Sequence, residues 1–109
     1  MTDRELLELA AKAAGLEIVS WVKGCPRINV GFPTSWNPLA DDGDAMRLSI
    51  VLDFMISFDF EAFGKVSVVS RRAGVFVTEG DRPDGRSYAT RRAITRAAAE
   101  IGKGIQHDT

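Results

Sequence analysis

The sequence has little of the side chains from which most metal and nucleophile sites are built. Its 109 residues include one cysteine and one histidine. A single cysteine excludes an internal disulfide and a multi-cysteine zinc site. A single histidine, His107, excludes any site that needs two imidazoles. No histidine is near Cys25 in the sequence, so we do not expect a cysteine–histidine nucleophile.

Long apolar runs and the common catalytic motifs are also missing. No stretch approaches the roughly 18 apolar residues of a transmembrane helix, and the N-terminus lacks the basic and apolar regions of a signal peptide. The sequence contains no P-loop, no dinucleotide-binding glycine motif, no zinc-protease helix and no serine-hydrolase elbow. We therefore expect a cytoplasmic protein that contacts no membrane and needs no cofactor. The sequence favours binding over catalysis, although an enzyme is not excluded.

The composition that remains is that of an ordinary folded domain. Hydrophobic residues make up 45% of the chain and charged residues 27%. The length predicts one domain over residues 1–109, with 105–109 as a frayed tail. Fourteen Lys and Arg against fifteen Asp and Glu give a net charge of −1, so no overall charge excess points to nucleic acid or to a membrane surface.

Three segments have apolar residues at helical spacing. These segments are residues 2–15, 42–55 and 87–101. The first begins with a capping box, in which the hydroxyl of Thr2 accepts a backbone N–H at Glu5 and the carboxylate of Glu5 returns to the amide of Thr2. We therefore expect three helices.

Alternating polar and apolar residues predict five strands. The expected strands are residues 16–23, 27–32, 57–62, 65–71 and 74–79, with loops at 33–44 and 80–86. The element order is then α-β-β-α-β-β-β-α. This order predicts an α+β domain: a three-layer α-β-α sandwich in which helices cover both faces of an antiparallel sheet of about five strands.

One local motif resembles a known protein family. The motif is W-N-P-L-x-D-D-G-D-A, from Trp36 to Ala45, and it is accompanied by similar segments at residues 6–15 and 90–100. Together these segments resemble the phage ABA sandwich (alpha-beta-alpha) domain of small phage and prophage proteins. The resemblance implies a three-layer fold and a location in the cytoplasm of a bacterial host. It implies no reaction and no catalytic residue.

The loop at 33–44 and the turn that follows it carry the first set of candidate binding residues. Trp36 is either a binding aromatic or a core side chain, and packing is favoured. The carboxylates after it either bind Ca²⁺ or Mg²⁺ or cap a helix, and capping is favoured because the spacing is not that of an EF-hand. The arginine is either an ion-pair partner or an anion clamp. The candidates are Trp36, Asn37, Asp41, Asp42, Asp44 and Arg47.

The charges are unevenly distributed along the chain. Residues 1–63 carry five basic and ten acidic side chains, whereas residues 64–109 carry nine and five. A basic face in the second half is a candidate nucleic-acid surface, although no recognised nucleic-acid-binding motif accompanies it. Pairing with the acidic half, within the chain or across a homodimer, also explains this face and is favoured. The candidates are Arg71, Arg72, Arg91, Arg92 and Arg96.

These observations leave three hypotheses about function. The leading one is an accessory protein that binds a protein partner, from the phage or its host, through the loop at 33–44. The second is a nucleic-acid-binding protein that uses the basic face. The third is a metal-dependent enzyme, or a metal-stabilised domain, built on Asp41, Asp42 and Asp44.

Overall fold

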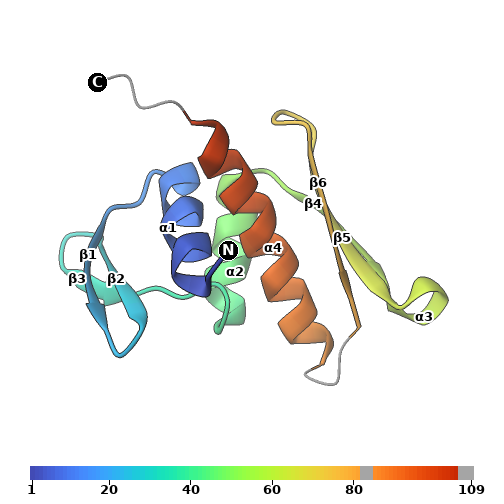
Figure 1. Cartoon of the computed structure of the whole chain (residues 1–109), viewed down its shortest axis with the longest axis horizontal. Coiled ribbons are helices and arrows are strands. Elements are labelled where there is room, and N and C mark those ends of the chain that lie inside the picture. The colour runs from blue at the N-terminus through green and yellow to red at the C-terminus, as the bar shows by residue number, and fades with distance from the viewer. Residues whose placement is uncertain (82–84, 106–109) are drawn as a thin grey trace.

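The computed structural model describes residues 1–81 and 85–105 of this α+β protein (Figure 1). The helices of this part of the chain are α1 (Asp3–Ala14), α2 (Asp42–Val51), the short α3 (Phe60–Phe63) and α4 (Arg86–Gly104). The strands are β1 (Ile18–Val22), β2 (Cys25–Asn29), β3 (Pro33–Ser35), β4 (Met55–Asp59), β5 (Lys65–Ser70) and β6 (Val75–Gly80). They form two antiparallel three-stranded sheets, in the orders β1-β2-β3 and β4-β5-β6.

The layering differs from the expected one. Figure 1 shows α1, α2 and α4 between the two sheets, with β1–β3 on one side and β4–β6 on the other. The expected single sheet of about five strands is wrong, because each strand pairs only with strands next to it in the chain. The loop and helix between β3 and β4 separate the two sets of strands. Helices thus form the middle layer, where a sheet was expected.

The first helix begins as the sequence predicts. The Thr2 hydroxyl accepts the Glu5 amide at 3.1 Å, and the Glu5 carboxylate accepts the Thr2 amide at 3.1 Å. The hydrogen bond from the Thr2 backbone, followed by that from its side chain, lowers the pKa of Glu5. The helix ends at Gly15, which adopts the left-handed conformation with φ of 72°. The capping box is therefore confirmed.

The last helix, α4, is the centre of the fold. Its most extensive contacts are with α1, and it also packs on β6, β5 and α2. Small side chains make this contact close: its buried residues are Ala89, Ala93, Ile94, Thr95, Ala97, Ala98, Ala99 and Gly102. A Cβ atom at Gly102 would lie 2.1 Å from the carbonyl oxygen of Leu9, so glycine is required where α4 crosses α1.

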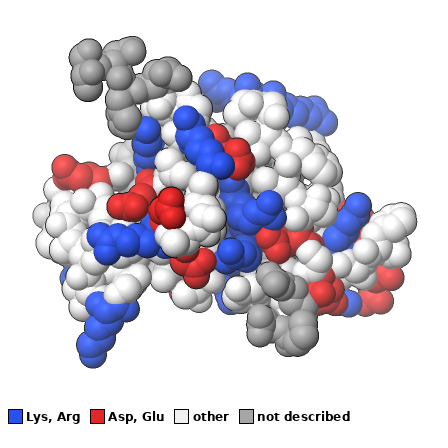
Figure 2. Space-filling model, in the orientation of Figure 1, with Lys and Arg blue, Asp and Glu red and all other residues white. Residues whose placement is uncertain are grey.

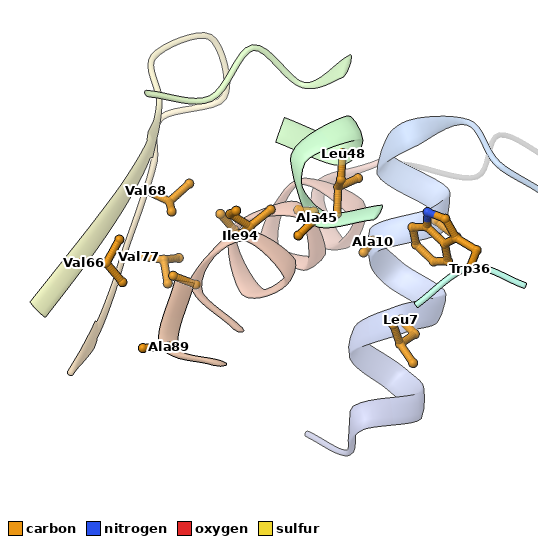
Figure 3. Packing of buried hydrophobic residues seen from close by; sticks show 14 of the residues in the cluster. Leu7, Ala10, Trp36, Ala45, Leu48, Val66, Val68, Val77, Ala89 and Ile94 are labelled. Atoms are coloured by element: carbon orange, nitrogen blue, oxygen red, sulfur yellow. The ribbon is translucent and has the colours of Figure 1, made fainter. Parts of the chain in front are cut away.

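A continuous core joins the layers through α4 (Figure 3). On one side Val66, Val68 and Val77 of the β4–β6 sheet point toward Ile94. On the other side, α2 and α1 bring their buried residues toward α4, and Trp36 lies beyond α1. The labelled members there are Ala45, Leu48, Leu7, Ala10 and Trp36.

The second helix ends four residues earlier than the predicted position. It stops at Val51, because Asp53 adopts a left-handed conformation with φ of 56°. The Asp53 amide then donates to the Ile50 carbonyl at 3.3 Å and the Phe54 amide to the Ser49 carbonyl at 3.0 Å, which is the Schellman arrangement. Met55, predicted as helical, is therefore the first residue of β4.

Other boundaries also differ from the sequence predictions, and the strand expected at 27–32 is β2 at Cys25–Asn29. The loop at 33–44 begins with a strand, β3, and the predicted strand at 57–62 ends at Asp59 before the α3 turn. Residues 82–84 of the predicted loop and residues 106–109 of the predicted tail, including His107, lie outside the described residues. Within residues 1–81 and 85–105, no helix combines the length and the apolar character that crossing a bilayer requires.

Candidate functional site

The tryptophan of the loop at 33–44 is a core residue. Trp36 is 4% exposed and belongs to the central hydrophobic cluster. Its amide donates to the carbonyl of Pro26 at 3.0 Å, which continues the pairing of β2 with β3. The packing interpretation of Trp36 is therefore confirmed, and Trp36 is not a free binding aromatic.

The polar residues after Trp36 bind one another. The Asp41 carboxylate accepts the Asp44 amide at 2.8 Å and caps α2. The Asp44 carboxylate accepts the Asn37 amide at 2.9 Å, and the Asn37 side-chain oxygen accepts the Leu39 amide at 3.1 Å. The helix-capping interpretation of the acidic cluster is confirmed. The motif at 36–45 thus folds the loop onto the start of α2.

The arginine beside this cluster also has a carboxylate partner. Arg47 donates to Asp44 at 2.6 Å, and its guanidinium lies 3.9 Å from Asp41. The hydrogen bond to Asp44, together with the charge of that carboxylate, raises the pKa of Arg47. The Arg47 side chain is 69% exposed, so the ion pair adds little to stability but holds the guanidinium in place.

The acidic cluster is not arranged around a cation. The Asp42 carboxylate accepts Arg91 of α4 at 2.7 Å, whereas Asp41 and Asp44 bind within the loop and the first turn of α2. In residues 1–81 and 85–105, no group of three or more His, Cys, Asp or Glu side chains is placed to hold a metal ion.

A cleft of about 360 Å³ lies next to this loop, between the β1–β3 sheet and α2. Three of the candidate residues line it: Trp36 contributes to its wall, and Asp44 and Arg47 supply charged groups. Asn37, Asp41 and Asp42 are not part of its lining. The other lining residues are mostly apolar, namely Ala14, Leu16, Ile28, Val30, Thr34, Ser35, Leu48 and Val51.

Two exposed valines of the cleft were not among the candidates from the sequence. Val30 follows β2 and Val51 is the last residue of α2, and both are mainly exposed. The sequence does hold a signal for the second of them. Val51 is apolar at an α2 position that the core does not use. A surface helix normally has a polar outer face, so apolar residues there indicate a contact surface.

The basic residues of α4 do not form a free basic face. Arg91 donates to Asp42 and, at 3.0 Å, to the Leu39 carbonyl. Arg92 lies 3.2 Å from Asp3 of α1, and Arg96 lies 2.5 Å from Glu79 of β6. Each arginine thus joins α4 to another part of the fold, as the pairing alternative expects.

The other two candidate arginines lie at a separate place. Arg71 and Arg72 are exposed in the turn between β5 and β6, and they form no ion pair within the described residues. Figure 2 shows Lys and Arg side chains at this hairpin tip and acidic side chains toward the α3 end of the sheet. The five candidate arginines therefore do not form one surface.

The site that the geometry defines is thus an apolar cleft with one arginine–carboxylate pair in its lining. No family model, no curated protein and no solved structure matches the chain.

Proposed function

We propose that the protein functions by binding a protein partner in the cleft between the β1–β3 sheet and α2. The single observation that carries this proposal is the cleft itself, whose lining is predominantly apolar and includes the fixed Arg47–Asp44 pair. Binding pockets are typically concave and apolar with a few placed polar groups. An apolar side chain of the partner fills the cleft, and a carboxylate or carbonyl of the partner accepts from Arg47.

The exposure of the cleft residues supports this proposal. Val51 is 64% exposed although it lines an apolar cleft, and Val30, another lining residue, is also exposed. Covering these side chains removes apolar surface from water, at about 25 cal/mol per Å². An exposed apolar patch with a charged rim is the usual composition of a protein-binding surface. The resemblance to phage proteins would make the partner a phage or host protein.

Two neighbouring residues of α2 provide a matched test. Val51 lines the cleft, whereas Ile50, with 69% exposure, does not. Peptides selected from a displayed random library on the wild-type protein are the probe, and their affinity is measured by calorimetry. We expect Val51→Asp to weaken binding by at least roughly tenfold, because a carboxylate must be desolvated against the bound apolar side chain. We expect Ile50→Asp to leave the affinity unchanged.

The selected sequences supply a second criterion. Peptides that fill an apolar cleft beside an arginine should share one large apolar residue with an acidic neighbour. Equal loss of binding in Val51→Asp and Ile50→Asp, or selection of no peptide at all, would contradict the proposed cleft. Circular dichroism confirms that both variants keep the fold.

A further inference from the structure

The edge strand β4 lacks the usual protection against pairing. Within the described residues β4 has one neighbour, β5, so its other side carries unpaired backbone groups. Natural edge strands are protected by lysines, prolines, bulges or a covering segment. The sequence of β4 is Met-Ile-Ser-Phe-Asp, with no lysine and no proline, and its pairing with β5 has no bulge. Such an edge is a template for another strand.

Apolar side chains next to this edge are also uncovered. Phe58 points to the helical side of the sheet, as its register partner Val66 does, yet Phe58 is 62% exposed whereas Val66 is buried. A cavity of about 420 Å³ lies over Phe58, between α2, α4 and α3, and Met46, Phe60 and Ile94 contribute to its lining. The contacts of α4 with this sheet are mainly with β6 and β5, so Ile56 is partly buried against the core while Phe58 stays exposed.

The opposite edge of the sheet is different. At β6, Arg96 of α4 donates to the Thr78 carbonyl at 3.2 Å and binds Glu79. A charged side chain thus occupies part of that edge, which is one of the ways in which proteins block strand addition. The unprotected edge of this sheet is therefore the β4 side.

The charges at the two ends of β4 have opposite signs. Met55, at the first end, pairs with Val69, and a pocket lined by both residues also includes Arg71, Arg72 and one carboxylate, Asp53, so this end has a net positive charge. At the other end Asp59 pairs in register with Lys65, and Arg86 lies 3.3 Å from Glu61 of α3 and 3.5 Å from Asp81. Three carboxylates against two basic groups leave this end with a net negative charge, and the Glu61 side chain is 90% exposed. Figure 2 shows basic side chains at the hairpin tip, and acidic side chains with basic ones among them toward α3.

We propose that the occupant of the β4 edge is a second copy of this chain, paired antiparallel through β4 about a twofold axis. Antiparallel pairing places the basic end of each strand beside the acidic end of the other, whereas parallel pairing would place like charges together. With Ser57 at the axis, Ile56 of each copy lies opposite Phe58 of the other. The result is a six-stranded sheet in which Phe58 is covered. This surface is separate from the cleft.

The distances across such a sheet are compatible with the charge pairing. Neighbouring strands lie about 4.8 Å apart, so roughly 10 Å separates β5 of one copy from β4 of the other. Arg71 and Arg72 follow β5 directly, and Asp59 and Glu61 are at the far end of the partner's strand. An extended arginine side chain and a carboxylate side chain together cover this distance. Because of the twofold symmetry, this pairing of arginines with carboxylates occurs twice in each dimer.

Charge reversal provides a test that depends on this particular geometry. The first variant is Arg71→Glu/Arg72→Glu and the second is Asp59→Lys/Glu61→Lys. Each variant paired with itself places like charges together, so we expect its dimer dissociation constant to rise by roughly 100-fold or more. In an equimolar mixture every contact again joins opposite charges, and we expect heterodimers to form. Sedimentation equilibrium of the full chain measures the mass against the 11.9 kDa of one copy.

A matched control separates this geometry from a general charge effect. Lys12→Glu/Lys23→Glu changes the net charge by the same amount as the first variant, at residues of α1 and of the β1–β2 turn. We expect this control to dimerise as the wild type does, and we expect added salt to weaken the wild-type dimer. A monomeric wild type, a dimer that is indifferent to both reversals, or two monomeric variants that do not associate on mixing would each overturn the proposal.

Hydrogen exchange gives a readout that needs no substitution. Pairing of β4 protects its outward amides, so exchange across Met55–Asp59 in the wild type should slow as the protein concentration rises. Exchange across β3, the edge of the other sheet, should not change with concentration. Exchange of β4 that is independent of concentration would overturn the proposal even if the variants did not fold.

Discussion

Side chains of the loop at 33–44 determine its shape by binding one another. Asn37, Asp41 and Asp44 each use a side-chain oxygen to accept a backbone amide of the same loop or of the first turn of α2. Arg47 then closes over Gly43, where a Cβ atom would lie 3.3 Å from its guanidinium. These polar residues therefore serve to fold the loop. The candidate binding surface is the apolar cleft next to them.

Replacing the buried tryptophan tests this assignment. We expect Trp36→Ala to lower the free energy of unfolding by about 3–5 kcal/mol, because it leaves a cavity among Ile28, Leu48 and their neighbours. Urea denaturation followed by circular dichroism measures the loss. The matched substitution Trp21→Ala removes a partly exposed ring that lies 4.3 Å from the Arg4 guanidinium, and it should cost clearly less. Equal costs would contradict the central position of Trp36.

At the scale of elements, local signals predicted helix starts better than helix ends. The start of α1 depends on Thr2 and Glu5, which are three residues apart, so its hydrogen bonds can be inferred from spacing alone. The end of α2 depends on Asp53 adopting a left-handed conformation. Aspartate adopts that conformation only occasionally, and Met55 continued the apolar spacing of the helix. The sequence therefore favoured a longer helix than the one that forms.

The many small residues of α4 reflect the number of elements that pack against it. Its small residues are distributed around much of the helix and are buried, because α1, α2 and the β4–β6 sheet all pack against it. A helix that covers one face of a sheet needs only one apolar stripe. The alanine run at 97–99 allows close packing, but the sequence alone does not identify α1 as the main neighbour.

The crossing of α1 and α4 supports a prediction about one glycine. Gly102→Ala places a methyl group against the Leu9 backbone, which cannot move without separating the helices. We expect a loss of about 1–3 kcal/mol in the free energy of unfolding, measured by urea denaturation. Gly104→Ala, in the same helix with open space around it, is the control and should be neutral or slightly stabilising. A neutral Gly102→Ala would contradict the close approach.

At the scale of the whole molecule, many charged side chains form ion pairs between different helices and strands. The basic second half of the sequence folds against the acidic first half, as Arg92 with Asp3 and Arg91 with Asp42 show. Within the described residues Arg71 and Arg72 take part in no such pair and remain exposed at the end of a sheet. Part of the asymmetry along the sequence is thus neutralised within the chain by pairs such as these, and Arg71 and Arg72 lie beside the proposed dimer interface.

This distribution leads to a prediction about nucleic acids. With three of the five candidate arginines bound to carboxylates, we expect no affinity for DNA or RNA that falls steeply with salt. Fluorescence anisotropy of single-stranded DNA, duplex DNA and RNA in a salt series measures this. Salt-sensitive binding that is lost in Arg92→Ala/Arg96→Ala would instead favour the nucleic-acid hypothesis. Loss of binding only in Arg71→Ala/Arg72→Ala would place the contact at the hairpin tip.

The sequence by itself determined the α+β class, the capping of α1 and α2, and the hairpins, because these depend on residues close together in the chain. The tertiary structure decided that helices separate two sheets, that Trp36 is buried, that Val51 borders a cleft and that β4 is left as an exposed edge. These features depend on which distant segments pack together. Alternating polar and apolar residues show that a strand has two unlike faces. They do not show which strand or helix covers each face.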